Sequence, residues 1–154
     1  MTDKCTPATW NDNKSSFRSN GASGPGGITV VLYGSEPFLR KTKEAATAGM
    51  AAKGDSSGKI AISTGNSTGI RQGTLGVYGN SPEADGDDAL LYTTGMCAPI
   101  PDLTAGELWR ANDGTLKLYA DITENTWTQY MGWYDDVNGW LYVNVQPPEL
   151  KPGT

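Results

Sequence analysis

Two short turn signals in the C-terminal half constrain the fold of this chain most. Asn112-Asp113-Gly114 and Asn138-Gly139 each lie between runs in which apolar and polar residues alternate. Glycine after Asn or Asp supplies the positive φ that a tight reversal requires. Alternation with a period of two is typical of strands that bury one face. The sequence therefore predicts two antiparallel β-hairpins, over 106–119 and 133–145.

The register of the first hairpin follows from the charges that it would bring together. A two-residue loop ending at Gly114 would set Arg110 opposite Lys117, where the two like charges repel each other. A three-residue loop with Gly114 in the bulge position sets Trp109 opposite Lys117, which allows a cation–aromatic contact. We therefore predict the three-residue loop, with Leu108 opposite Leu118 and a shared apolar face made of Leu108, Leu116 and Leu118.

The second hairpin repeats this plan, and we expect the two hairpins to pack side by side as a degenerate internal repeat. Alternation predicts that Leu141, Val143 and Val145 face the core. Between the hairpins lies a further alternating run, which should also share one face: Trp127, Gln129, Met131 and Trp133.

The opposite face of this predicted sheet is aromatic. Two interpretations are open for its rings. They cover a second layer of the same domain, as in a sandwich core, or they form a patch for oligomerisation or docking. A small sheet must bury its second face, so the rings should contact either another layer of this domain or another molecule. The residues concerned are Trp109, Tyr119, Trp140 and Tyr142.

The first half of the chain adds strands and one ambiguous segment. Runs rich in β-branched and apolar residues between turn residues predict strands at 28–33, 59–63, 74–78 and 89–93. The alanine-rich stretch 43–53 favours a short surface helix on propensity alone. The expected fold is therefore mainly β: antiparallel hairpins in a small sandwich or barrel-like domain, with at most one short helix.

Both ends of the chain differ in composition from this domain. Residues 1–27 hold little to bury and end in a run of Gly, Ala, Ser and Pro, so we expect an extended N-terminal arm. The arm is either an unattached tail or a segment that orders on a partner through Trp10 and Phe17 as anchors. The predicted division is arm 1–27, β domain 28–146 and Pro-rich C-terminal tail 147–154.

The composition argues against most catalytic chemistry. The chain has no histidine, which removes the usual general base and the commonest zinc ligand. The segment 54–60 lacks the glycine spacing of a phosphate loop, and the acidic segment 83–88 lacks the pattern of a calcium loop. The carboxylates show no pair spaced for hydrolysis. We expect no enzyme, no catalytic residue, no cofactor and no metal site.

Charge and cysteine content bound the partners and the compartment. A formal net charge of -5 does not favour phosphate backbones, so we expect no nucleic-acid binding. No run approaches the roughly 18 apolar residues of a membrane span, and the N-terminus lacks the apolar core of a signal peptide. Cys5 and Cys97 allow a single bridge from the arm to the domain, but we favour two reduced thiols.

One stretch resembles a known class of proteins. Tailed-bacteriophage virion proteins, particularly of phages that infect cyanobacteria and other aquatic bacteria, carry a pattern G-D/E-L-W … D-G-x-L-x-x-Y … W in head-decoration and tail-fibre modules. This chain has Gly106-Glu107-Leu108-Trp109, then Asp113-Gly114 followed by Leu116 and Tyr119, then Trp127. The resemblance covers less than a fifth of the chain.

The resemblance implies a non-catalytic β module attached to a virion. Because a tail fibre is usually a longer chain, it favours a capsid decoration (cement) protein that binds and stabilises the major capsid protein lattice. Such proteins are commonly homo-oligomers, often trimers, so we expect a trimer on the capsid surface of a virion assembled in the host cytoplasm. A tail-fibre or carbohydrate- or receptor-binding β module is the alternative.

Deleting residues 1–27 should abolish attachment to capsids and leave the β domain folded, because the arm holds the predicted anchors Trp10 and Phe17. Co-sedimentation with capsids measures attachment, and circular dichroism of the truncated protein measures folding. A folded truncated protein that still binds capsids would contradict the predicted role of the arm.

Overall fold

The computed structural model describes residues 8–11, 29–32, 35–64 and 73–153, with side chains described from residue 35 onward. The mainly β prediction is confirmed: strands dominate and pair antiparallel. The single helical turn in the described residues is a 3-10 turn, η2, at Tyr119–Asp121. Residues Ala8–Asn11 (β1) and Thr29–Leu32 (β2) pair as a two-stranded ribbon, so the strand predicted at 28–33 has its partner inside the predicted arm.

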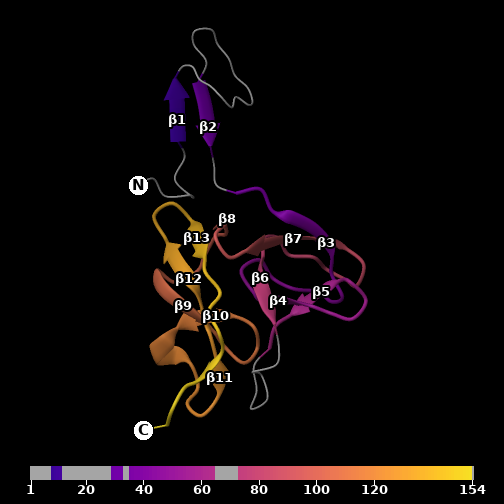
Figure 1. Cartoon of the computed structure of the whole chain (residues 1–154), viewed down its shortest axis with the longest axis vertical. Coiled ribbons are helices and arrows are strands. Elements are labelled where there is room, and N and C mark those ends of the chain that lie inside the picture. Colours follow the sequence, from indigo (N-terminus) through magenta and orange to yellow (C-terminus); the bar gives the residue numbers. More distant parts are fainter. Residues whose placement is uncertain (1–7, 12–28, 33–34, 65–72, 154) are drawn as a thin grey trace.

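Two five-stranded sheets contain most of the strand residues that the structure describes (Figure 1). The first sheet has the order β3-β7-β6-β4-β5, and the second has the order β10-β9-β12-β13-β8. The first sheet comprises β3 (Phe38–Lys41), β4 (Ala51–Gly54), β5 (Ile60–Ile62), β6 (Thr74–Tyr78) and β7 (Asp88–Thr93). The second comprises β8 (Cys97–Pro99), β9 (Gly106–Arg110), β10 (Leu116–Leu118), β12 (Tyr130–Asp135) and β13 (Trp140–Val143).

The main core lies between the two sheets, in a sandwich-like arrangement. The second sheet contributes large aliphatic side chains, and the first contributes Ala51, Val77 and Tyr92. A backbone hydrogen bond of 2.8 Å, donated by Ala51 to the carbonyl of Gly114, ties β4 to the first hairpin turn. The side chains from the second sheet include Leu108, Leu116, Met131, Tyr134, Leu141 and Val143.

A second, smaller core lies on the other face of the first sheet. Alternate residues of the same strands point into it, so both faces of the sheet contribute buried residues, whereas the residues of β3 are exposed. The two edge strands of this sheet meet at one point, where Thr42, just after β3, forms an isolated parallel bridge with Ile60 of β5. The buried Thr42 hydroxyl lies 3.0 Å from the hydroxyl of Tyr78. The small core comprises Ala52, Ile60, Tyr78, Ala89 and Leu91.

The helix expected at 43–53 is wrong. Residues Ala51–Gly54 form strand β4, and Ala51 and Ala52 are fully buried on its opposite faces. Gly49 has φ +94°, which favours glycine and interrupts any helix there. Alanine has high helix propensity, but a strand buried between two cores needs small side chains, and this packing outweighs propensity.

Both hairpin predictions in the second half are confirmed. In the first, Lys117 lies opposite Trp109 and Leu118 lies opposite Leu108, as the three-residue loop requires. Gly114 has φ +90°, and Gly139 of the second hairpin has φ +73°. Strands β9 and β12 pair with each other, so the two hairpins lie side by side as expected.

Strand β12, which pairs with both β9 and β13, contains a β-bulge that the alternation does not reveal. Tyr130 pairs with Trp109 and Gly132 pairs with Leu108, so Met131 is an extra residue on β12. The predicted common face of Met131 and Trp133 is therefore wrong. Met131 is fully buried, whereas Trp133 is 44% exposed on the other side of the sheet.

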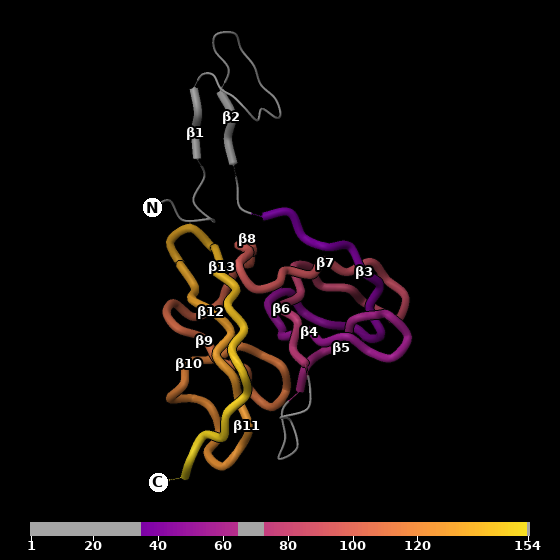
Figure 2. Tube along the Cα trace, viewed as in Figure 1, coloured from indigo at the N-terminus to yellow at the C-terminus, as the bar shows by residue number. Residues whose placement is uncertain are grey.

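The C-terminal segment returns along the second sheet. Residues Glu149–Leu150 (β14) pair with Trp127–Thr128 (β11), and Figure 2 shows the segment beside β11. The Lys151 ammonium donates to the carbonyls of Tyr119 and Ile122 at 2.8 and 2.7 Å. Through residue 151 the predicted Pro-rich tail is thus hydrogen-bonded to the body of the protein.

Cys97 begins β8 and is disulfide-bonded, so the preference for reduced thiols is wrong for this residue. Its side chain is fully buried. The other cysteine of the chain, Cys5, lies outside the described residues.

Replacing Gly76 by alanine should destabilise the protein by about 2–3 kcal/mol, because the added Cβ collides with the backbone carbonyl of Tyr92 on the neighbouring strand. Gly73→Ala is the matched control, since nothing lies within 4 Å of its added Cβ, and it should change stability by less than about 0.5 kcal/mol. Urea unfolding measures both. Equal losses would contradict the close approach of β6 and β7.

Candidate binding face

The outer face of the second sheet is built from three cross-strand rows of residues. Opposite residues of antiparallel strands point to the same side, and their inward neighbours form the main core. In the first row Trp109 lies between Lys117 and Tyr130, and in the second Trp133 lies between Glu107 and Tyr142. In the third row Trp140 lies between Asp135 and Pro99. We call the rings of this surface the aromatic face: Trp109, Tyr119, Tyr130, Trp133, Trp140 and Tyr142.

The rings pack against one another in two groups. Trp109 meets Tyr119 and Tyr130 edge-on, with centroids 4.7 and 5.6 Å away. Trp133 and Tyr142 lie 5.4 Å apart at an interplanar angle of 35°, which makes them a gently tilted pair. Such contacts add about 0.5–1.5 kcal/mol per pair beyond area burial. Five of the six rings are half-buried, and Trp133 is the exposed one.

The sequence analysis predicts four of these six residues on one face of the sheet. In the structure three of the four are strand residues of that face, and the fourth lies in the helical turn η2. Trp109, Trp140 and Tyr142 project from the outer face, and Tyr119 joins them from η2 through its contact with Trp109. Lys151 lies 4.8 Å from the centroid of the Tyr119 ring and forms a cation–aromatic contact there.

Two aromatic residues of this face were missed. Alternation predicts that Trp133 shares a face with Met131, and it assigns Tyr130 no place on the aromatic face. The signal that could have found both is Gly132, since a glycine inside a strand often marks a bulge. Gly132 has φ +147°, and an added Cβ would collide with the carbonyl of Tyr142.

The two predicted anchors of the arm are not part of this geometry. Trp10 is a residue of β1, where its backbone pairs with that of Val30. Phe17 lies outside the described residues. Their role as anchors stays a prediction.

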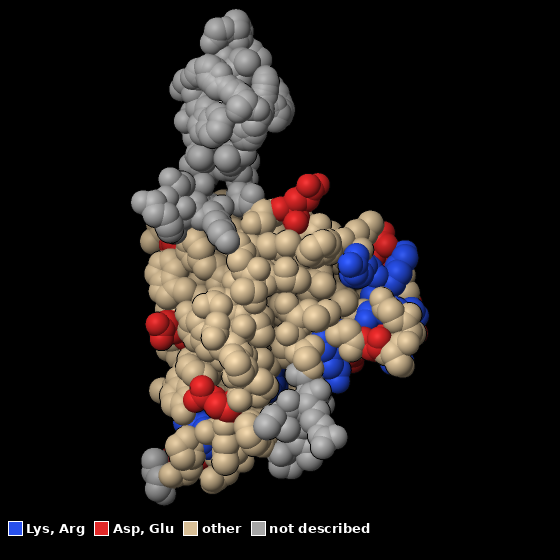
Figure 3. All heavy atoms as spheres, in the orientation of Figure 1, with Lys and Arg blue, Asp and Glu red and all other residues tan. Residues whose placement is uncertain are grey.

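Charged side chains lie around the aromatic face and over strands β3 and β5 of the first sheet. Glu107 and Lys117 are exposed at the ends of their rows, and Asp135 begins the second hairpin turn. The hydrogen bonds from Asn138, with further ones from backbone N–H groups, lower the pKa of Asp135. In Figure 3 most of the visible surface over the second sheet carries no charge, whereas basic side chains gather over β3 and β5.

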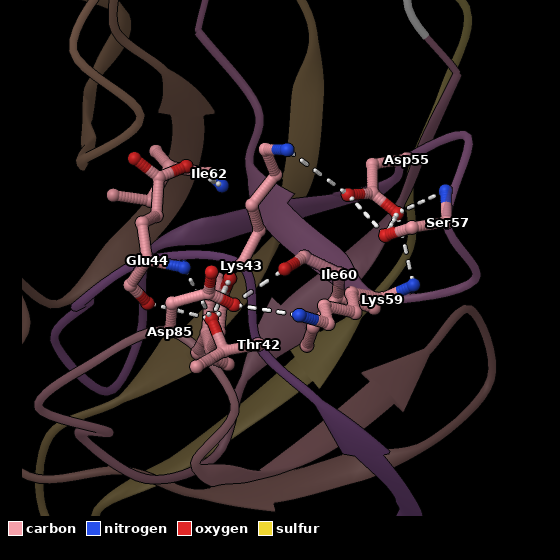
Figure 4. A network of polar contacts seen from close by, with 10 residues as sticks. Thr42, Lys43, Glu44, Asp55, Ser57, Lys59, Ile60, Ile62 and Asp85 are labelled. Atoms are coloured by element: carbon pink, nitrogen blue, oxygen red, sulfur yellow. Dashed lines mark hydrogen bonds and ion pairs between the residues drawn. The ribbon is translucent and has the colours of Figure 1, made fainter.

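The segment that was compared with a phosphate loop is a hairpin turn. The Asp55 carboxylate accepts hydrogen bonds from the Ser57 hydroxyl and from the backbone N–H groups of Ser57 and Lys59, all between 2.8 and 2.9 Å. These bonds, with the Ser57 hydroxyl first, lower the pKa of Asp55. Asp55 therefore shapes the β4–β5 turn and has its acceptor positions filled (Figure 4).

The acidic segment 83–88 is likewise committed to structural contacts. Asp85 and Asp88 form ion pairs of 2.7 Å with Lys59 and Lys41. Asp87 accepts from the backbone N–H groups of Glu83 and Ala84. Among the described residues, no three Asp, Glu, Cys or His side chains cluster in a way that could hold a metal ion.

Comparisons with known proteins bring no relative. No protein family model, curated protein or solved structure matches this chain. Within the described residues, no helix has the length and apolar character needed to span a membrane.

Replacing the neighbours Trp133 and Tyr134 by alanine should have unequal effects, because consecutive strand residues point to opposite faces and the bulge before them turns Tyr134 into the core. Tyr134 is 2% exposed and donates to the carbonyl of Ile100 at 2.6 Å, so its loss should cost about 4 kcal/mol. Trp133 is half-exposed, and its loss should cost about 1 kcal/mol or less. Urea unfolding distinguishes the two, and a larger loss at Trp133 would contradict this assignment of faces.

Proposed function

We propose that this chain is a non-enzymatic structural protein of a virion, most specifically a decoration protein that binds the major capsid protein lattice through the aromatic face. The observation that carries the proposal is the position of this face. The inner face of the second sheet packs into the main core, while its outer face gathers six aromatic rings that stay partly exposed; the exposed apolar residues of the first sheet, such as Phe38 and Leu39, form no such group of rings. The resemblance of the motif between Gly106 and Trp127 to virion proteins supports the finer identity.

The chemistry of the aromatic face suits a protein partner. Trp and Tyr dominate the binding energy of many interfaces because each buries a large rigid surface at little entropic cost. Trp133 and its neighbour Tyr142 form the more exposed ring pair and are the proposed anchors. The packed group around Trp109 is the supporting surface beside them.

The stabilising role follows from mass action. A protein that binds the assembled lattice, and binds it better than free subunits, shifts the equilibrium toward the assembled state. We propose a homo-oligomer, a trimer in the first instance, on the capsid surface. An acidic chain with a formal net charge of -5 fits a partner other than the packaged nucleic acid.

A carbohydrate- or receptor-binding module is the second candidate, and one feature favours it. In the second row the tilted pair of Trp133 and Tyr142 continues into the exposed carboxylate of Glu107. A ring surface beside a hydrogen-bond acceptor can stack on a sugar ring and accept from its hydroxyls. This candidate uses the same face with a different ligand.

The test is co-sedimentation of the purified full-length chain with capsids assembled from the major capsid protein of a tailed phage of aquatic bacteria, beside a glycan array. The expected result is saturable binding at a fixed ratio to capsid subunits and no glycan signal. Trp133→Ala should weaken capsid binding at least tenfold, since an anchor residue contributes about 2 kcal/mol or more.

The matched control is Phe38→Ala, because Phe38 is 43% exposed on the first sheet, against 44% for Trp133. It should leave binding unchanged. Equal loss in both variants would contradict docking through the aromatic face. A glycan signal that Trp133→Ala removes, without capsid binding, would replace the proposal by the second candidate.

A further inference from the structure

A buried arginine lies at one end of the main core with part of its charge unsatisfied. Arg110 is the last residue of β9, points inward after Leu108, and is 1% exposed. Its Nε donates to the side-chain oxygen of Gln129 at 2.9 Å. Its Nη1 is buried and has no hydrogen-bond partner among the residues that the structure describes.

The side chains around Arg110 form a polar cluster that spans the two sheets. The Thr74 hydroxyl of β6 donates to the same Gln129 oxygen at 2.6 Å, and the Ser63 hydroxyl lies 2.6 Å from that of Thr74. The Thr128 hydroxyl donates to the carbonyl of Arg110 at 2.7 Å. Four of the five buried polar residues in the described chain belong to this cluster: Ser63, Arg110, Thr128 and Gln129.

No side chain of the cluster accepts a hydrogen bond from Nη1 of Arg110. The Gln129 oxygen already accepts two hydrogen bonds, and the Gln129 amide donates to the carbonyl of Gln146 at 2.8 Å. The Thr74 hydroxyl uses its proton on Gln129 and can only accept from Ser63. A guanidinium has five N–H donors and no acceptor. The hydroxyl oxygens of Ser63 and Thr128 keep lone pairs, but neither accepts from Nη1, so these side chains as they are arranged do not supply its acceptor.

The missing group should also carry negative charge. Within the described residues Arg110 makes no ion pair, and its neighbours in the cluster are all neutral. Burial lowers the pKa of Arg110, because desolvation penalises the charged form. A guanidinium stays protonated in proteins all the same, and buried charges are as a rule paired.

We propose that Arg110 Nη1 marks a binding site for a small anion, of the size of chloride or formate, between the two sheets. The depth of Arg110 excludes a macromolecular partner, and its charge favours an anion over a neutral acceptor. The site is distinct from the aromatic face and does not depend on the function proposed for it. Its occupation stabilises the fold, because an anion that binds only the native state shifts unfolding by mass action.

Thermal unfolding of the full chain tests the site. Sodium chloride or sodium formate, exchanged against sodium gluconate at constant ionic strength, should raise Tm in a saturable way, since gluconate is too large for a buried site. Arg110→Met keeps the length of the side chain without its charge and should remove this dependence. Lys117→Met is the matched control, because Lys117 is an exposed cation of the neighbouring strand β10, and it should keep the dependence.

If Arg110→Met does not fold, a second measurement on the unaltered protein tests whether an anion binds at Nη1. Crystals soaked in bromide should show anomalous density within hydrogen-bond distance of Nη1. A water molecule at that position without bromide density would overturn the proposal. So would a Tm that responds to the anions equally in the unaltered protein and in Arg110→Met.

Discussion

The packing of the second sheet on the first is the interaction on which the rest of the structure depends. The first sheet has small buried residues such as Ala51, Ala52 and Ala89, so its strands β4 and β7 can contribute buried residues to both cores without large voids. The second sheet brings the bulky aliphatic side chains, and it can bury only one face against the first. Its other face then has to be covered by its own side chains. Large rings that pack edge-on do this best, because each shields a wide area of backbone and still leaves a polar tip in water.

The bulge at Met131 adjusts this arrangement. Without the extra residue, strict alternation would send Trp133 into the core and Tyr134 outward. With it, the core receives Met131 and Tyr134, which can fill irregular space and reach the carbonyl of Ile100, while the largest ring stays outside. A bulge also increases the local twist of a strand. Because the bulge at Met131 lies in the pairing of β12 with β9, it also fixes the register of the two hairpins relative to each other.

The hairpins could be predicted from sequence because their information is local. Gly114 and Gly139 fix the reversals, and charge repulsion between Arg110 and Lys117 selects the register within one hairpin. The same is true of the strands at 59–63 and 74–78, which alternate clearly. The mainly β fold and three of the face residues follow from these elements alone.

What could not be predicted depends on contacts between distant segments. Alanines at 51 and 52 are strand residues because two cores require small side chains there, and no local pattern shows the cores. The edge strand β3 was missed, since its exposed residues show no alternation. The prediction that Trp133 shares a face with Met131 is wrong, because the bulge at Met131 is fixed by pairing with β9. The disulfide of Cys97 also joins segments that are distant in sequence, so no local pattern predicts it.

The polar cluster at Arg110 shows why a sandwich of this kind tolerates buried polar groups. Apolar packing between two sheets is non-directional, so it fixes their separation better than their relative position. The hydrogen bond from Thr74 of the first sheet to Gln129, which directly precedes β12 of the second sheet, joins the sheets at one defined point. Gln129 in turn orients Arg110 and binds the carbonyl of Gln146 beyond β13. Loss of Gln129 would leave several buried donors without acceptors, which costs more than the bonds contribute. We infer that the cluster specifies how the sheets align, while the aliphatic core supplies most of the stability.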